Sequence, residues 1–331
     1  MKRAVILAGA VAALLAAAPA WAAREDTIAV IGDTPYGDAQ IAGFPGDIAE
    51  INADPDVQRV IHLGDIKNGS SRCDDSYFAA RFADFQTFAD PLVYTPGDNE
   101  WTDCHRANNG GYTPTERLAA IRTLFFPRPG RTLGQDQRKV DYQSRAYPEN
   151  VMWDASRVQY GVVHVVGSND SQLPWFTDRA SGPETPAERQ LQVEEYTGRE
   201  AAGLEWVNTL FDRAEQRHVA GVVLGMQADM WDPAAAAGTL TAFDPYKELI
   251  ARRAAEFGRP VLLFEGDSHV FTVDRPAGMP ANLTRVVVQG STSVPHEWLR
   301  LHIDPKSDGV FSCEVIPFGG AAHACPSPLG G

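Results

Sequence analysis

Seven short hydrophobic runs rich in Val, Ile and Leu are spaced along the chain, and each ends in a loop that carries Gly or Asp. They cover residues 27–33, 57–65, 91–98, 158–170, 219–229, 259–269 and 284–291. Because successive side chains of a strand point to opposite faces, a run that is apolar at nearly every position is typical of a strand buried on both faces. The pattern therefore predicts seven strands inside the molecule.

Between these runs, apolar residues recur at three- and four-residue spacing, which predicts helices with one buried face. One helix is expected to begin in Thr113–Glu116, which has the form of a capping box with Pro at the first helical position. A second is expected from Asp244 to a stop at Gly258. Residues 202–217 and 78–85 show the same helical spacing. Strands that alternate with helices predict an α/β fold in which helices cover the sheet faces.

One long segment does not follow either period. Residues 171–200 are polar and contain three prolines. We expect this segment to be an insertion or a lid over the surface, and not a boundary between domains.

The first 22 residues have the features of a signal peptide. Lys2 and Arg3 precede the apolar stretch AVILAGAVAALLAAA, and Ala20-Trp21-Ala22 provides a small-x-small cleavage signal. The apolar stretch is shorter than the roughly 20 residues that span a bilayer. We therefore expect residues 1–22 to be removed and residues 23–331 to form one domain. That domain is expected to be periplasmic or secreted and to have no membrane attachment after cleavage.

The charge of the chain argues against a polyanionic partner. The formal net charge is −14 at pH 7, and no cluster of Lys or Arg in the sequence offsets it. Proteins that bind nucleic acid use such clusters to neutralise phosphates. We expect no nucleic-acid partner, and the sequence leaves the oligomeric state open.

The chain has four cysteines, Cys73, Cys104, Cys313 and Cys325. In an exported protein four cysteines indicate two disulfides, for which three pairings are possible. Proximity in the sequence favours Cys73 with Cys104 and Cys313 with Cys325. Buried free thiols are the alternative.

Polar side chains follow the predicted strands, at the positions where ligands gather in open α/β sheets. These side chains are Asp33, Asp65, Asp98, Gln227, Asp267 and His269. Several carboxylates near one point need a cation or a shared proton to offset their repulsion. A ligand set of oxygens with one imidazole favours manganese, magnesium or calcium, and the imidazole keeps zinc or iron possible. The sequence therefore predicts a site for divalent metal ions.

The order of these loops resembles the five signature blocks of the calcineurin-like metallophosphoesterases, a family that includes the purple acid phosphatases. The matching blocks are GD at 32, GD at 64, GDNE at 97, the polar residue at 227 and GDSH at 266. The resemblance extends from about residue 27 to residue 290. It implies a four-layer αββα sandwich, with two mixed β-sheets flanked by helices and a two-metal site at the strand ends. It also implies hydrolysis of phosphate mono- or diesters by a metal-activated water, so that a small phosphorylated substrate is the expected partner.

The resemblance implies a role for each metal-binding position. Asp65 would bridge two metals, with Asp33 and His269 on one side and Asp98 and Gln227 on the other. Asp267 stands where the family has a histidine, and its carboxylate remains a possible oxygen ligand.

The candidate catalytic residues are Asn99 and Glu100, which the same comparison aligns with the family's third block, and His105, which lies a few residues beyond the Asp98 loop. Asn99 stands where the family has the histidine that protonates the leaving group, and its amide cannot transfer a proton at neutral pH. Without such a proton donor, substrates with good leaving groups are expected, unless Glu100 or His105 supplies the proton. The alternative is a catalytically silent relative that uses the same cleft to bind a ligand or a partner.

Overall fold

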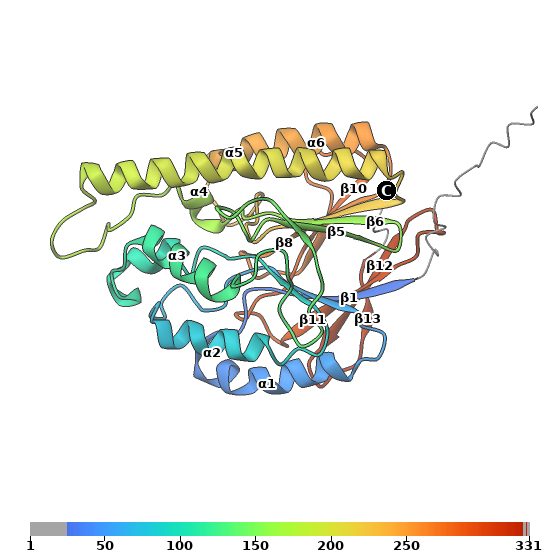
Figure 1. Cartoon of the computed structure of the whole chain (residues 1–331), viewed down its shortest axis with the longest axis horizontal. Coiled ribbons are helices and arrows are strands. Elements are labelled where there is room, and N and C mark those ends of the chain that lie inside the picture. The colour runs from blue at the N-terminus through green and yellow to red at the C-terminus, as the bar shows by residue number, and fades with distance from the viewer. Residues whose placement is uncertain (1–24, 327–328, 330–331) are drawn as a thin grey trace, which may run out of the picture.

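The computed structural model describes residues 25–326 and residue 329. Two β-sheets lie face to face between two layers of helices (Figure 1). The α/β class and the two mixed sheets flanked by helices are therefore confirmed. The expected signal peptide, residues 1–22, lies outside the described residues. Within the described part of the chain, no helix combines the length and the apolarity that a membrane span requires.

The first sheet has the strand order β13-β12-β11-β1-β2-β3. Its strands are β1 (Asp26–Ile31), β2 (Arg59–His62), β3 (Leu92–Tyr94), β11 (Glu297–Ile303), β12 (Phe311–Pro317) and β13 (His323–Ala324). Strands β1, β2 and β3 are parallel, and β11, β12 and β13 are each antiparallel to their neighbours. The outer face is covered by α1 (Gly37–Ala53) and α2 (Asp75–Phe85), and α3 (Pro114–Phe125) packs beside α2.

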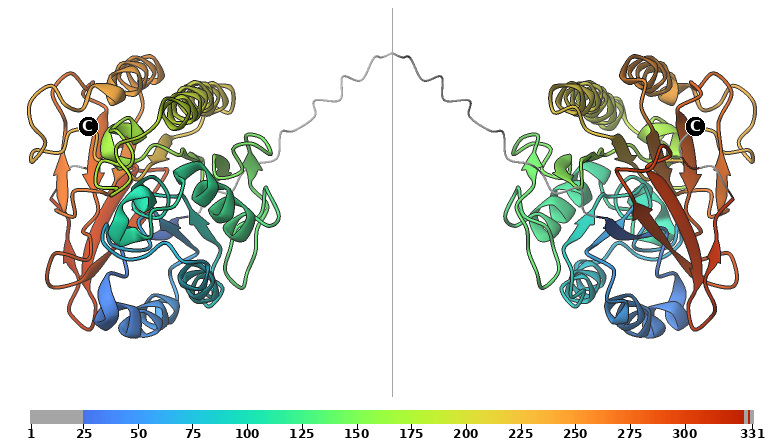
Figure 2. Two further views of the ribbon diagram at one scale, coloured as in Figure 1. Left: turned by 90° about the vertical axis from the view of Figure 1, so that its left-hand side faces the viewer. Right: turned by 90° about the vertical axis from the view of Figure 1, so that its right-hand side faces the viewer.

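The second sheet has the strand order β4-β5-β6-β7-β8-β10-β9. Its strands are β4 (Asp141–Tyr142), β5 (Val151–Ala155), β6 (Val158–Val162), β7 (Gly221–Gly225), β8 (Val261–Glu265), β9 (Thr272–Asp274) and β10 (Leu283–Val287). The neighbours β6, β7, β8 and β10 are parallel. Helices α5 (Pro186–Gln216) and α6 (Asp244–Phe257) cover the outer face, and Figure 2 shows them end-on, on the opposite side of the molecule from α1 and α2.

The connections carry four shorter helices. These are η1 (Thr102–His105), η2 (Ala107–Asn109), α4 (Gly167–Ser171) and η3 (Thr241–Phe243).

The main core lies between the two sheets. Val30 and Ile61 of the first sheet belong to the same buried cluster as Val162, Val223 and Phe264 of the second sheet. Each of these side chains is at most 1% exposed. Because the parallel strands are covered on both faces, nearly all their positions are apolar, which is why they are visible in the sequence.

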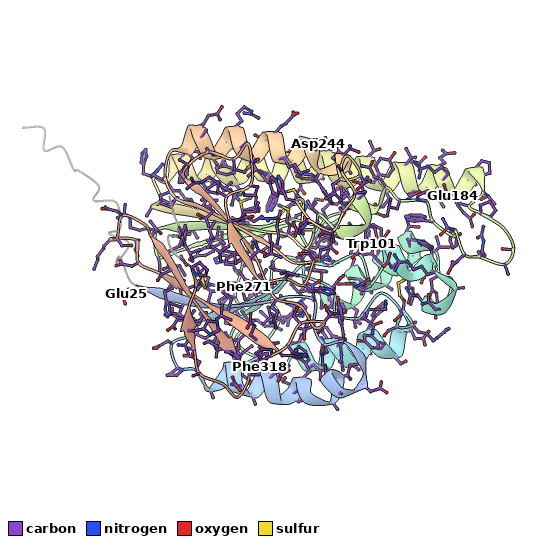
Figure 3. The ribbon with its side chains drawn as sticks, turned by 180° about the vertical axis from the view of Figure 1, so that it is seen from behind. Glu25, Trp101, Glu184, Asp244, Phe271 and Phe318 are labelled. Carbon is purple, nitrogen blue, oxygen red and sulfur yellow. A yellow bond between two sulfur atoms is a disulfide. The ribbon has the colours of Figure 1, made fainter. Side chains whose placement is uncertain are left out.

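All seven predicted strands are present, and the predicted helices correspond to α2, α3, α6 and the second half of α5. The expectation that residues 171–200 form an insertion or a lid is wrong for residues 186–200, which form the first half of the long helix α5. The Thr185 hydroxyl accepts from the Glu188 N–H, and the Glu188 carboxylate accepts from the Thr185 N–H, so a capping box starts this helix. Only residues 172–185 remain a loop, and Figure 3 shows Glu184 at the projecting end of the molecule.

Both expected disulfides are confirmed. Cys73 is joined to Cys104 with a Cα–Cα distance of 5.8 Å, and Cys313 is joined to Cys325 with a Cα–Cα distance of 5.3 Å. The first disulfide ties the loop after β2 to the loop after β3. The second lies at the opposite edge of the same sheet, between β12 and the end of β13.

Replacing both Cys73 and Cys104 by Ser should lower the free energy of unfolding by roughly 3 to 4 kcal/mol, because the disulfide closes a loop with a sequence separation of 31. The matched control replaces Cys313 and Cys325, whose separation is 12, and should cost roughly 3 kcal/mol or less. Urea unfolding of both variants measures the difference. If the first variant lost no more than the ~0.5 kcal/mol of a typical surface substitution, the disulfide would not stabilise these loops.

Candidate metal centre

The predicted ligand residues converge at the carboxyl ends of the parallel strands. Asp33, Asp65 and Asp98 follow β1, β2 and β3 of the first sheet, and Asp267 and His269 follow β8 of the second. Two groups of ligating atoms result, each with all its atoms within 4.8 Å of one another. The first group is Asp33, Asp65 and His269, and the second is Asp65, Asp98 and Asp267. These groups can hold metal ions, and Asp65 belongs to both.

Close approach of the loops explains the glycine that precedes Asp98. A Cβ atom added to Gly97 would lie 2.1 Å from Asp65 Oδ1, closer than any side chain can come. Gly64 has φ +88°, and a Cβ there would lie 2.6 Å from the Gly97 nitrogen. The backbones of the loops after β2 and β3 therefore touch, which brings Asp65 and Asp98 together.

Asp65 is held by donors on both of its oxygens. The Asn99 N–H donates to Oδ1 at 3.0 Å, and the Asn99 amide nitrogen donates to Oδ2 at 2.6 Å. The Tyr36 hydroxyl also donates to Oδ2, at 3.2 Å. Asp65 is 1% exposed, so these contacts fix its orientation inside the protein.

Asp33 and His269 form the other side of the cluster. The Asp267 N–H donates to both oxygens of Asp33 at 3.1 Å, and His269 Nε2 lies 3.3 Å from Asp33 Oδ1. The second ring nitrogen of His269, Nδ1, lies 2.7 Å from the Thr292 hydroxyl. A hydrogen bond on Nδ1 orients the ring so that Nε2 faces the carboxylates.

Gln227 lies in the cluster, but its orientation differs from that of the expected metal ligand. Its Oε1 accepts from the Gly167 N–H at 2.7 Å, and an N–H can only donate, so the amide cannot be turned round. Its Nε2 consequently faces the carboxylates, at 3.1 Å from Asp267 and 3.4 Å from Asp98. Gln227 thus offsets the negative charge as a donor, and its oxygen faces away from the two groups.

Burial and mutual repulsion favour the protonated forms of these carboxyl groups. Burial and then the charges of Asp98 and Glu100 raise the pKa of Asp65 well above its usual value. Burial and the charges of Asp98 and Asp33 do the same to the pKa of Asp267. Burial also raises the pKa of Asp33, against the opposing effect of His269. A set of acidic oxygens with this much repulsion fits a hard divalent cation.

The three candidate catalytic residues have different surroundings. Asn99, 9% exposed, donates to Asp65 as described above. Glu100 is fully buried, and its Oε1 accepts from the Tyr94 hydroxyl at 2.7 Å and from the Gly97 N–H at 2.8 Å. It also accepts from the Asp65 N–H at 3.2 Å. Glu100 therefore supports the backbone of the ligand loops, which does not fit the expected role as a proton donor.

His105 is also engaged away from the two ligand groups. Its Nδ1 accepts from the Phe176 N–H at 2.8 Å, and the two rings pack edge to face with centroids 5.7 Å apart. Burial lowers the pKa of His105 to about 4, so the ring is neutral at pH 7. These contacts hold the loop after α4 and do not fit the expected catalytic role.

Two side chains at the site were not identified from the sequence. The Tyr36 hydroxyl lies 3.2 Å from Asp65 and 3.4 Å from His269 Nε2, and the Ser168 hydroxyl donates to Asp98 at 2.7 Å. The one available signal for Tyr36 is its place in the loop that begins with Asp33. The sequence does not indicate that Ser168 belongs to the site, because the direction of its hydroxyl depends on a left-handed backbone at φ +54°.

The comparisons with known proteins concern the fold. No family model matches the chain, and no curated protein matches it. A solved structure described as GAP50, the anchor in the inner membrane complex of Plasmodium, is 9% identical with a TM-score of 0.50, and the match covers 92% of this chain and 89% of that chain. A putative 5'-nucleotidase from Staphylococcus aureus in complex with alpha-ketoglutarate is 12% identical with a TM-score of 0.48, and the match covers 89% of this chain and 54% of that chain. At 9% identity, the likeness to the Plasmodium structure is one of fold alone.

Binding of Mn²⁺ should release protons and become tighter as the pH rises from about 5 to about 8, because ligands must be deprotonated to bind. The pKa values of Asp33, Asp65 and Asp267 are all raised in the protein by itself. Burial lowers the pKa of His269, but its contact with Asp33 outweighs this effect and the pKa is raised as well. Calorimetry in buffers of different ionisation enthalpy counts the protons. An affinity independent of pH, with no proton released, would contradict this account.

Proposed function

We propose that this protein is an exported, metal-dependent phosphoesterase of the calcineurin-like family that hydrolyses phosphate mono- or diesters. The observation that supports this proposal most directly is the membership of Asp65 in both groups of ligating side chains. A carboxylate shared between two such groups suits a pair of metal ions. The order of the ligand loops along the chain supports the same proposal.

The chain offers ligands for two ions. Asp33, Asp65 and His269 would hold one ion, and Asp65, Asp98 and Asp267 would hold the other. Divalent ions bound there would activate a water molecule and bind the oxygens of the phosphoryl group. Because carboxylate oxygens dominate, we propose manganese, magnesium or calcium, while the single imidazole also permits zinc or iron.

The residues around the cluster indicate which substrates would react most readily. Asn99 holds Asp65 and has no proton to transfer at neutral pH. Lys67 is fully buried, and its amine donates to the Asn68 and Asn99 carbonyls at 2.8 and 2.7 Å. Bound metal, and not this amine, would then neutralise the phosphate. We propose substrates whose leaving group departs without protonation, such as aryl phosphates.

The proposed location is the periplasm or the cell exterior. The two disulfides fit an oxidising compartment. The signal peptide expected in residues 1–22 points to the same place.

The second candidate function is binding of a ligand or partner without turnover. It is favoured by the two amides, Asn99 and Gln227, which stand where the resembled family has histidines. Gln227 also turns its nitrogen toward the carboxylates, an orientation that suits charge neutralisation better than metal binding.

Measurement of metal content together with phosphatase activity tests the proposal. The purified protein should contain metal and hydrolyse p-nitrophenyl phosphate or its diester when manganese, magnesium, calcium or zinc is added. Asp65→Asn should lower kcat/KM by more than the roughly 10- to 100-fold that the loss of a supporting contact costs, because both ligand groups lose a member. The matched control is Asp136→Asn, which changes an exposed carboxylate paired with Arg138 and should retain activity.

The outcomes distinguish the two candidates. Hydrolysis that depends on Asp65 supports the phosphoesterase. Bound metal without turnover supports the binding protein. Absence of bound metal, with no hydrolysis sensitive to Asp65→Asn, would contradict the metal site itself.

A further inference from the structure

A strained turn lies between β6 and the loop that precedes α5, in the segment Gly167–Ser171 labelled α4, whose backbone is not that of a right-handed helix. Four consecutive residues, Ser168 to Ser171, have φ values of 54°, 52°, 52° and 62°. L-residues visit this left-handed region rarely and as single residues, because Cβ crowds the neighbouring carbonyl. Such a backbone persists only where the surrounding structure holds it in place, and it is most often found at functional sites.

Side chains from α5 and η1 hold the turn. Arg199 of α5 is fully buried, forms an ion pair with the Asp170 carboxylate and donates to the Asp170 carbonyl at 2.9 Å. Gln192, also on α5, donates to the Ser171 carbonyl at 2.7 Å. The Thr102 and Ser171 hydroxyls lie 2.6 Å apart. The left-handed backbone is therefore held by buried contacts from two other elements.

The turn directs the Ser168 hydroxyl toward the metal centre. Ser168 Oγ donates to Asp98 Oδ2 at 2.7 Å and lies 3.3 Å from Asp103 Oδ1. The other oxygen of Asp98, Oδ1, lies 3.4 Å from Gln227 Nε2. Each oxygen of the Asp98 carboxylate thus has a donor, and the orientation of the group is set by Ser168 and Gln227.

We infer that Ser168 is a positioning residue, which acts through Asp98 on the metal position formed by Asp65, Asp98 and Asp267. This inference rests on the proposed metal-dependent function. The effect of Ser168 should be specific to this one of the two proposed metal positions, because its hydroxyl contacts Asp98 and neither Asp33 nor His269. The other position has its own supporting hydroxyl, that of Thr292 on His269 Nδ1 at 2.7 Å.

The test compares Mn²⁺ dissociation constants of the full mature protein and its variants by calorimetry, with Tm measured in parallel. Ser168→Ala removes the hydroxyl and should weaken one Mn²⁺ site by about 10- to 100-fold, with little change at the other. Thr292→Val should weaken the other site instead. Equal weakening of both sites in Ser168→Ala would contradict the specific role.

Two further variants separate the hydroxyl from the backbone. Ser168→Gly also removes the hydroxyl, but glycine accepts φ +54° without strain, so Tm should be at least that of Ser168→Ala while the same Mn²⁺ site is weakened. Asn169→Gly relieves strain at the next position, leaves the contact with Asp98 and should change both affinities by less than about threefold. Should Ser168→Ala fail to fold, Ser168→Gly decides the question.

Several results would overturn the inference. Both Ser168 variants could retain both Mn²⁺ affinities, in which case the hydroxyl does not position Asp98. Asn169→Gly could weaken the same site as much as Ser168→Ala, in which case the turn as a whole acts and the hydroxyl does not. Wild-type protein that binds no Mn²⁺ would contradict the proposed metal site, and the inference with it. Binding by the wild type that is unchanged in Ser168→Ala and Ser168→Gly would contradict the inference alone.

Discussion

Repulsion among carboxylates buried around Asp65 is the constraint on which the rest of the site depends. Asp33, Asp65 and Glu100 are at most 1% exposed, and the raised pKa of Asp65 reflects both burial and the neighbouring charges. Donors surround the cluster in compensation, and they include the amides of Asn99 and Gln227. A cation at the centre would offset the remaining charge far more effectively than these dipoles do, which is why we propose that the cluster binds metal.

The scaffold brings these groups together through features that are individually ordinary. Parallel strands in two facing sheets end at the same edge, and loops with glycine at the contact points allow the backbones to touch. The Cys73–Cys104 disulfide joins the loops that follow β2 and β3. Trp101, labelled in Figure 3, lies inside the molecule directly after this ligand loop, with its ring beneath the Arg199 guanidinium at 5.4 Å. Buried contacts on both sides of the loop after β3 therefore hold Asp98 in place.

The sequence predicted those parts of the structure that depend on local pattern. Strands buried on both faces are continuous apolar runs and were found, whereas β11 and β12 bury mainly alternate positions and were missed. Helix α1, with Pro45 inside it, also escaped prediction. The Gly-Asp pairs located the aspartates that converge at the candidate site, because a strand end has a fixed place in the fold. The orientations of Gln227 and Glu100 could not be predicted, because they depend on donors such as Gly167 and Tyr94 that only the folded chain brings near.

The central claim is that Asp65 bridges two metal ions. Anomalous diffraction from crystals of residues 23–331 grown with Mn²⁺ tests it most directly. The account predicts two anomalous peaks, both at roughly 2.0 to 2.6 Å from the Asp65 carboxylate, one beside His269 and the other beside Asp98. Peaks elsewhere, or none near Asp65 at saturating Mn²⁺, would contradict it.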